Sequence, residues 1–334
     1  MLKGHGDDLH NFEEIQYNFS SNVFFEGCRL ELIKELQNFV GSAVNNYPSP
    51  VAYELSICAA ERFRMGPKKF LFFNGATEAL YTIAQLFNRQ SATIFAPTFA
   101  EYEGACDVHK IQIDWKTRNE FHQVNTNLAF ICNPNNPDGS IVSIDKIELF
   151  LKQNTQTTLV VDEAYIEFTN TIDSVVHLCN EYKNLIVVRS LTKVFAIPGI
   201  RLGYVISNDK LIEKLKACKM PWSVNSMAIK AGECIFQNYD RWHFSIQSIM
   251  IEMQAFLSKL SMVDYLELMP THTTYVLARL KKGKASELKQ YLAKKHKILI
   301  RDATNFTKLR GECIRISLQS KEANEFLIEA LNKW

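Results

Sequence analysis

The segment from Arg189 to Tyr204 contains one lysine, Lys193, among small hydroxyl residues, with Arg201 eight positions further on. A lysine in these surroundings is suited to forming a Schiff base with the aldehyde of pyridoxal phosphate (PLP). Ser190 and Arg201 are suited to holding the phosphate of that cofactor. Most lysines are solvated surface residues, so this interpretation depends on what the rest of the chain offers.

Four further segments with polar or aromatic side chains follow short apolar runs. They are Asn74–Glu78, Pro97–Tyr102, Asn133–Gly139 and Asp162–Tyr165. Ligands of open α/β sheets bind outside the carboxyl ends of the strands. Each segment alone has an ordinary structural explanation, such as a tight turn or a helix N-cap. Together with the lysine segment, and in this order, they favour a common binding site.

Individual groups in these segments suit different parts of PLP. Backbone N–H groups of Gly75, Ala76 and Thr77 are placed to approach a phosphate at the start of a helix, where the helix dipole favours negative charge. Phe99 is suited to stacking on the ring. Asp162 is suited to pairing with the protonated ring nitrogen, which keeps the ring an electron sink.

Three more side chains complete the predicted site. Asn136 and Tyr165 are placed to contact the ring oxygen of the cofactor, and Tyr102 to line the substrate side. The chain has no G-x-G-x-x-G motif, so a nicotinamide-dependent dehydrogenase lacks its main fingerprint.

The composition is that of an ordinary globular protein. The chain has 334 residues, of which 47% are hydrophobic and 22% charged, with a net charge of +2. Scattered basic residues argue against nucleic acid or an anionic membrane surface as a partner. No apolar run approaches the ~18 residues of a membrane span, and the N-terminus lacks the apolar part of a secretory signal. We therefore expect a cytoplasmic protein.

The eight cysteines show neither a C-x-x-C pair nor the spacing of metal ligands. A chain of this length with a full apolar core does not depend on a disulfide framework. We expect free thiols in a reducing compartment and no metal site.

Alternating strands and helices predict an α/β domain. Continuous apolar runs at 70–73, 93–96, 128–132, 159–161 and 185–188 indicate buried strands, and residues 77–87 and 144–152 suit crossover helices. This pattern predicts a mostly parallel sheet between helices. After residue 232 the order changes to α+β, with a long helix at 240–260, strands at 275–278, 298–300 and 313–318, and a last helix at 321–331. We expect a large domain at 38–232 and a small domain formed by 1–37 and 233–334.

The five segments in this order resemble the class I/II aminotransferase superfamily of fold-type I PLP enzymes, and the resemblance covers essentially the whole chain. It implies that Lys193, Asp162 and Tyr165 are the catalytic residues. It also implies that the cofactor is bound by Gly75, Ala76, Thr77, Phe99, Asn136, Asp162, Tyr165, Ser190, Lys193 and Arg201. Tyr47 matches a tyrosine that reaches the phosphate in the partner subunit, so the resemblance implies a homodimer.

Further short segments are similar to the threonine-phosphate decarboxylase branch, which serves cobalamin biosynthesis. They are His5-Gly6, Phe19–Asn22, Arg189–Tyr204, Met220–Asn225, Ile300–Asp302 and Ile314-Arg315. The resemblance implies substrate contacts from His5, Gly6, Asn22, Asn136, Arg301 and Arg315, in addition to Tyr102 on the substrate side. It implies decarboxylation of O-phospho-L-threonine to (R)-1-amino-2-propanol O-phosphate and CO2. Two arginines and a histidine suit a substrate that carries a carboxylate and a phosphate.

The chain departs from that branch at two places. Asp7 stands where the branch has a second glycine, and Val23–Phe25 replaces its usual turn. Asp162–Phe168 fits the histidinol-phosphate aminotransferase branch equally well. The alternative is therefore an aminotransferase of that type, with 2-oxoglutarate as acceptor. A non-catalytic ligand-sensing protein is a third hypothesis, which the presence of Lys193 and Arg201 argues against.

Overall fold

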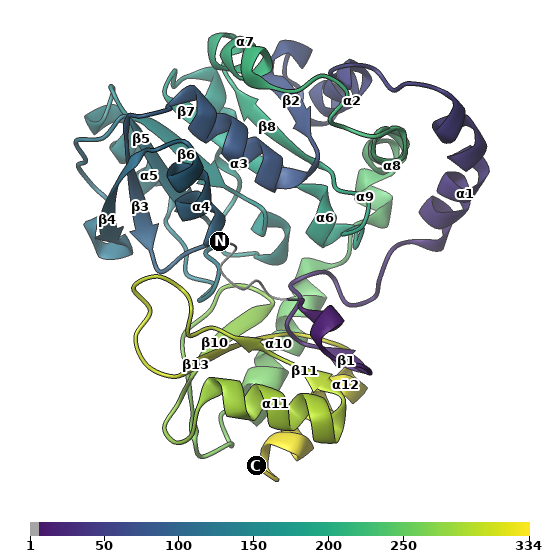
Figure 1. The fold of residues 1–334 in the computed structure, drawn as a ribbon, viewed down its shortest axis with the longest axis vertical. Coiled ribbons are helices and arrows are strands. Elements are labelled where there is room, and N and C mark those ends of the chain that lie inside the picture. Colours follow the sequence, from purple (N-terminus) through teal and green to yellow (C-terminus); the bar gives the residue numbers. More distant parts are fainter. Residues whose placement is uncertain (1–6) are drawn as a thin grey trace.

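The apolar runs in the first two thirds of the chain form a seven-stranded sheet (Figure 1). The computed structural model describes residues 7–334. In sheet order the strands are β2 (Phe70–Phe73), β8 (Gly203–Ser207), β7 (Leu185–Ser190), β6 (Thr158–Asp162), β5 (Leu128–Cys132), β3 (Ser91–Ala96) and β4 (Gln112–Thr117). Only β8 runs antiparallel to its neighbours, which confirms the predicted mostly parallel sheet.

The sequence does not predict β4 or β8. β4 lies at the edge of the sheet, and its residues are half-buried or exposed, so it lacks a continuous apolar run. β8 is buried throughout but begins at Gly203, directly after the lysine segment. A Cβ atom on Gly203 would lie 2.4 Å from the backbone nitrogen of Ala76, so this strand can pass the start of the next helix only with a glycine there.

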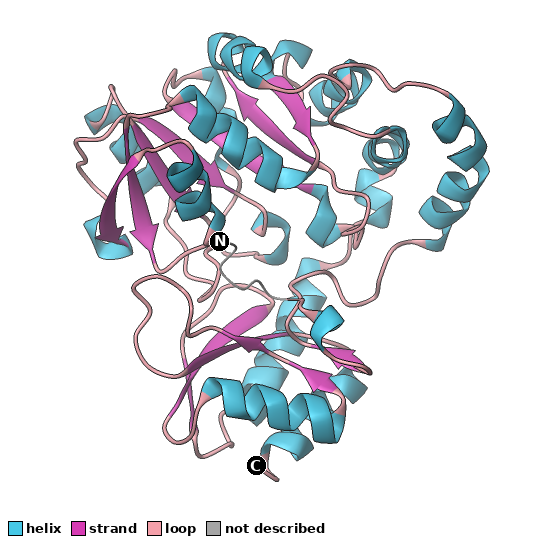
Figure 2. Ribbon diagram, in the orientation of Figure 1, coloured by secondary structure: helices cyan, strands magenta, loops and turns pink. Residues whose placement is uncertain are grey.

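Helices cover both faces of this sheet (Figure 2). They are α2 (Tyr53–Phe63), α3 (Gly75–Leu86), α4 (Glu101–Val108), α5 (Ile144–Gln153), α6 (Leu191–Val194), α7 (Asp209–Cys218) and α8 (Ser226–Gln237). Short 3-10 helices lie at Leu9–Asn11, Pro67–Lys69, Arg118–Glu120, Ile166–Phe168 and Val175–Asn180. α3 and α5 confirm the two predicted crossover helices. Strands that are apolar on both sides require such cover.

The C-terminal third of the chain forms a four-stranded antiparallel sheet with helices packed against it (Figure 1). The strands are β12 (Arg301–Asp302), β13 (Cys313–Ser317), β10 (Tyr275–Leu280) and β9 (Leu266–Leu268), and the helices are α10 (Ile246–Leu260), α11 (Ala285–His296) and α12 (Lys321–Leu331). α12 has the predicted bounds.

Two predictions for this region were wrong. The helix expected at 240–260 is two helices, α9 (Tyr239–Trp242) and α10, because Ser245 caps α10 through the backbone N–H of Ser248. The strand expected at 298–300 ends at Leu299, and Ile300 separates it from the next strand, which belongs to another sheet. β11 (Ile298–Leu299) pairs in parallel with β1 (Tyr17–Asn18), whereas β12 joins the four-stranded sheet.

The N-terminal segment reaches both domains. β1 pairs with β11, and the backbone N–H of Ser317 on β13 donates to the carbonyl of Phe19. α1 (Leu30–Asn45) instead packs against α8 of the large domain. The boundaries expected at residues 38 and 232 both fall inside helices, α1 and α8.

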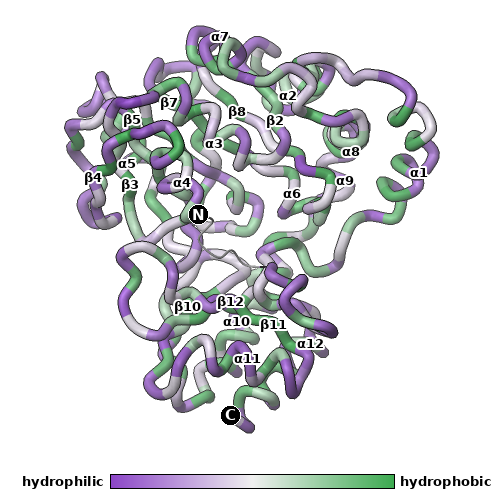
Figure 3. The backbone as a smooth tube through the Cα atoms, in the orientation of Figure 1, coloured by the Kyte–Doolittle hydropathy of each residue, from purple (hydrophilic) through white to green (hydrophobic). Residues whose placement is uncertain are grey.

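Apolar residues are concentrated along the strands and the inner faces of the helices (Figure 3). No helix within residues 7–334 is long and apolar enough to cross a membrane. All eight cysteines lie within residues 7–334 and are free thiols in the structure.

Candidate active site

Lys193 lies on α6, directly after the end of β7, and lines two cavities of about 340 and 110 Å3. The cavities also share Thr77, Phe99 and Tyr165. Burial, together with the charges of Arg315 and Arg201, lowers the pKa of Lys193 to about 8. The amine is therefore partly neutral near pH 8, and the neutral amine is the form that attacks a carbonyl carbon.

Asp162, the last residue of β6, presents a buried carboxylate to the smaller cavity. The hydroxyl of Tyr102 donates to Oδ2 at 2.7 Å, and the backbone N–H of Ala164 donates to Oδ1 at 3.0 Å. Burial raises the pKa of Asp162, and these two hydrogen bonds act against that rise. A carboxylate held in a dry site by two donors is suited to pairing with a protonated ring nitrogen.

A cup suited to phosphate forms where α3 begins. Gly75 has a φ of +82°, and a Cβ atom there would lie 2.5 Å from Nη2 of Arg201. The Arg201 guanidinium therefore lies directly against the glycine backbone. The smaller cavity is lined by Ala76, Thr77 and Ser190 as well as Arg201. Free N–H groups at a helix start, hydroxyls and a guanidinium are donors that bind phosphate.

Three predicted ring-contact residues line these cavities. Phe99 and Tyr165 line both, and Asn136 lines the larger one. Burial raises the pKa of Tyr165 to about 12, although Arg315 opposes it, so the phenol keeps a proton to donate. The structure thus brings these side chains together with Lys193, as the sequence predicts.

Arg315 of β13 connects the small domain to the cavity. Its Nη1 donates to Oδ1 of Asn136 at 2.5 Å, and its Nη2 donates to the carbonyl of Ser20 at 2.6 Å. Its Nε is buried and has no hydrogen-bond partner among the described residues. Asn22 lines the same cavity and accepts a hydrogen bond from Ser317, so two predicted substrate residues lie at the domain boundary.

Two other predicted substrate residues do not line the cavity. The expected position of Tyr102 on the substrate side was wrong: its ring is fully buried, stacked on Phe130, and its hydroxyl points to Asp162. Arg301 is buried, donates to Asn305 at 2.7 Å and lies over the ring of Phe306. It is absent from the residues that line the larger cavity.

The remaining predicted residues lie elsewhere. Tyr47 is 90% exposed, with its ring 6.0 Å from that of Trp222, and it lies outside both cavities of this chain. His5 and Gly6 fall outside the described residues.

Two acidic side chains in the larger cavity were missed as site residues. Asp7 lines it with a φ of +64° and raises the pKa of Lys193 against the effect of burial. In the sequence, Asp7 replaces the second glycine of the decarboxylase branch, and this difference could have pointed to Asp7 as a site residue. Glu101 also lines the cavity and accepts a hydrogen bond at 2.7 Å from Tyr81. Glu101 lies inside one of the five segments, but nothing in its spacing distinguishes it from a surface carboxylate.

These residues fit PLP. The donors at the start of α3 suit its phosphate, the buried carboxylate of Asp162 suits its ring nitrogen, and the amine of Lys193 suits its aldehyde. Arg201 lies so close to Gly75 that residue 75 cannot carry a side chain. No side chain therefore covers the backbone of Gly75, and a phosphate can approach it.

The fold and this donor set define a fold-type I PLP enzyme. Residues 14–331 match the family aminotransferase class I and II, and the chain belongs to that family. It is similar to the histidinol-phosphate aminotransferase of Thermoanaerobacter pseudethanolicus, with 30% identity over 91% of this chain and 88% of the relative.

Two solved structures share the fold. The L-threonine-O-3-phosphate decarboxylase of Porphyromonas gingivalis has a TM-score of 0.91 and 34% identity, covering 95% of this chain and 98% of that one. The histidinol-phosphate aminotransferase of Clostridium acetobutylicum has a TM-score of 0.84 and 26% identity, covering 94% and 98%. The chain is therefore a PLP-dependent enzyme of this family.

Proposed function

We propose that this protein decarboxylates O-phospho-L-threonine, giving (R)-1-amino-2-propanol O-phosphate and CO2. The observation that carries the proposal is the likeness to the P. gingivalis decarboxylase, which exceeds the likeness to the C. acetobutylicum aminotransferase in both TM-score, 0.91 against 0.84, and identity, 34% against 26%.

Arg315 is the side chain best placed to hold the substrate carboxylate. Its buried Nε is a hydrogen-bond donor without a partner among the described residues, at a cavity that Lys193 also lines. A buried donor without a partner destabilises the folded protein, and a hydrogen bond to an anionic ligand would remove that penalty. The Asn136 amide and the Ser20 carbonyl fix the other two nitrogens of the guanidinium, so Nε is held in one direction.

PLP, when bound, supplies an electron sink for the bond that breaks at the substrate Cα. Decarboxylation would break the bond between Cα and the carboxylate, whereas transamination would remove the Cα proton. The direction in which Arg315 holds the carboxylate would therefore decide between the two reactions. The Lys193 amine, with a pKa of about 8, is suited to giving a proton to Cα in the first case or moving it in the second.

The second candidate is a histidinol-phosphate-type aminotransferase that uses 2-oxoglutarate. The 30% identity with the T. pseudethanolicus aminotransferase favours it. Both reactions need the same cofactor residues and differ in how the substrate is held, where a displacement of about 1 Å changes the outcome.

We also propose that the protein is a homodimer with a shared active site. Tyr47 lies on a face with several exposed apolar side chains and does not contribute to the cavities of its own chain. Val40, Val44 and Trp222 line one groove together with Tyr47. A second copy covering this face would bury the apolar side chains and bring Tyr47 to the partner's site.

The deciding experiment measures CO2 release from O-phospho-L-threonine by the PLP-loaded protein without any keto acid. We expect sustained multiple turnover. A single turnover that leaves the pyridoxamine form and no CO2 would contradict the decarboxylase and favour the aminotransferase, with histidinol phosphate as the next substrate to test. The variant Lys193→Ala is the control and should release no CO2.

A further inference from the structure

Arg118 lies outside the active site, where β4 ends and a 3-10 helix (Arg118–Glu120) begins. The Glu120 carboxylate accepts hydrogen bonds from the backbone N–H and the hydroxyl of Thr117, at 2.8 and 2.7 Å, which fixes the backbone before Arg118. Arg118 forms no ion pair within residues 7–334. The charge of Asp138 acts on this guanidinium without forming an ion pair, and the side-chain hydrogen bonds of Arg118 go to backbone carbonyls instead.

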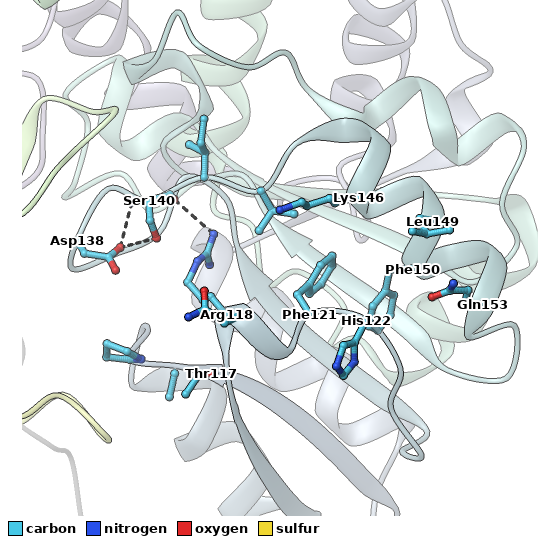
Figure 4. Close-up of a pocket in the computed structure, with 15 residues that line it drawn as sticks. Thr117, Arg118, Phe121, His122, Asp138, Ser140, Lys146, Leu149, Phe150 and Gln153 are labelled. Carbon is cyan, nitrogen blue, oxygen red and sulfur yellow. Dashed lines mark hydrogen bonds between the residues drawn. The ribbon is translucent and has the colours of Figure 1, made fainter.

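The side chain of Arg118 reaches across the sheet to a different strand. β3 lies between β4 and β5, yet Nη1 of Arg118 donates to the carbonyl of Cys132, the last residue of β5, at 2.9 Å. Nη2 donates to the carbonyl of Ser140 at 3.4 Å. Figure 4 shows Arg118 pointing toward Ser140 along the wall of a cavity of about 650 Å3. The planar fork of one guanidinium therefore joins two carbonyls.

Those two carbonyls bracket the loop at 133–139, which carries Asn136. The Ser140 carbonyl also accepts the backbone N–H of Asn135 at 2.8 Å, so Arg118 and Asn135 share one acceptor. Asn136, the next residue, meets Arg315 across the domain boundary through its Oδ1. Arg118 thus holds both ends of a loop whose centre presents the amide of Asn136 to the active site.

We propose that Arg118 is a positioning residue that holds Asn136 in place for the cofactor and for Arg315. The inference rests on the proposed role of Asn136 as a contact of the cofactor ring. Arg118 itself touches neither cavity of the active site. Its charge strengthens two bonds to backbone carbonyls, which a neutral side chain with one donor cannot reproduce.

The test measures the PLP dissociation constant, from the absorbance of the holoenzyme at graded PLP concentrations. We expect Arg118→Ala to raise that constant about tenfold, the loss typical of a charge-assisted hydrogen bond. We expect Asn136→Ala to raise it by a similar factor, and the double variant to lose little more than either single variant. Lys146→Ala is the matched control, because Lys146 lines the same cavity without a side-chain bond to the loop, and its dissociation constant should not change.

Chemical rescue separates positioning from a general structural role. The cavity beside Arg118 has room for a guanidinium ion, so millimolar guanidinium should restore PLP binding to Arg118→Ala and leave Asn136→Ala unchanged. An unchanged dissociation constant in Arg118→Ala would overturn the inference. A roughly hundredfold loss in the double variant, without rescue, would overturn it equally, because the two residues would then act independently.

Misfolding of Arg118→Ala and failure of the CO2-release experiment each have a defined consequence for the inference. If Arg118→Ala does not fold, Arg118→Gln keeps one donor nitrogen and removes the charge and the planar fork. We then expect an intermediate loss of PLP affinity, and no loss would overturn the inference. PLP binding does not depend on which reaction follows, so failure to release CO2 from O-phospho-L-threonine leaves this test intact. Unchanged PLP affinity in Asn136→Ala would overturn the premise and the inference together.

Discussion

At the scale of single residues, the environment of Lys193 decides its charge. The pKa of an ordinary lysine is 10.5, whereas burial, Arg315 and Arg201 lower that of Lys193 to about 8. Below pH 8 the folded protein must keep a buried ammonium beside two arginines, which destabilises it. Between pH 8 and 10.5 the unfolded chain binds this proton and the folded chain does not, so stability rises with pH in that window.

We therefore predict that Lys193→Met stabilises the PLP-free protein at pH 7 and that its advantage shrinks toward pH 10. The difference in the free energy of unfolding between Lys193→Met and the wild type should fall by roughly 3 kcal/mol between pH 7 and pH 10, because each unit of pKa shift corresponds to about 1.4 kcal/mol. Urea unfolding of both proteins at the two pH values measures this difference. All other titratable groups are the same in both proteins, so their contributions cancel. Parallel pH profiles for the two proteins would contradict the lowered pKa.

The Tyr102 hydroxyl opposes the rise in the pKa of Asp162 that burial causes. This hydroxyl donates to Oδ2 at 2.7 Å inside a dry site. Tyr102→Phe removes that donor, so the pKa of Asp162 should rise further and the carboxylate should pair less well with the ring nitrogen. We expect PLP to bind several-fold more weakly, measured by titration of the apo-protein. Tyr182→Phe is the matched control, since it removes a 2.7 Å bond to Glu148 far from the site and should leave PLP affinity unchanged.

At the scale of elements, the start of α3 depends on one glycine. Gly75 has a φ of +82°, which side chains rarely adopt, and an added Cβ would meet Arg201 at 2.5 Å. We predict that Gly75→Ala displaces the guanidinium and raises the PLP dissociation constant at least about tenfold. Gly66→Ala should have no effect, because a Cβ there meets nothing within 4 Å. Equal PLP affinity in the two variants would argue against the phosphate cup.

At the scale of the whole molecule, the exposed apolar face around α1 favours association with a second copy of the chain. Val44 is 79% exposed and Tyr47 90% exposed. We predict a dimer by sedimentation, and Val44→Asp should give a monomer that also binds PLP more weakly, because Tyr47 no longer reaches a neighbouring site. Met262→Asp provides the control, as Met262 is 76% exposed but lies in the small domain. A monomeric wild type would contradict the shared active site.

The sequence by itself determined which strand ends carry the site. Apolar runs followed directly by Asn74–Glu78, Asp162–Tyr165 or the lysine segment are local features, and parallel strands place their carboxyl ends at one edge of a sheet. For this reason Lys193, Asp162, Tyr165 and Phe99 meet at the smaller cavity, as predicted.

Only the tertiary structure decided which partner each polar side chain takes. Tyr102 points to Asp162, 60 residues away in the chain, and Arg315 meets Asn136 over a separation of 179 residues. Arg118 follows the edge strand β4, which the sequence did not predict, and its side chain bonds past β3 to the end of β5. Spacing fixes where a residue sits on its own element, but its contacts depend on how distant elements pack together, because hydrogen bonds form between atoms that are close in space and not in sequence.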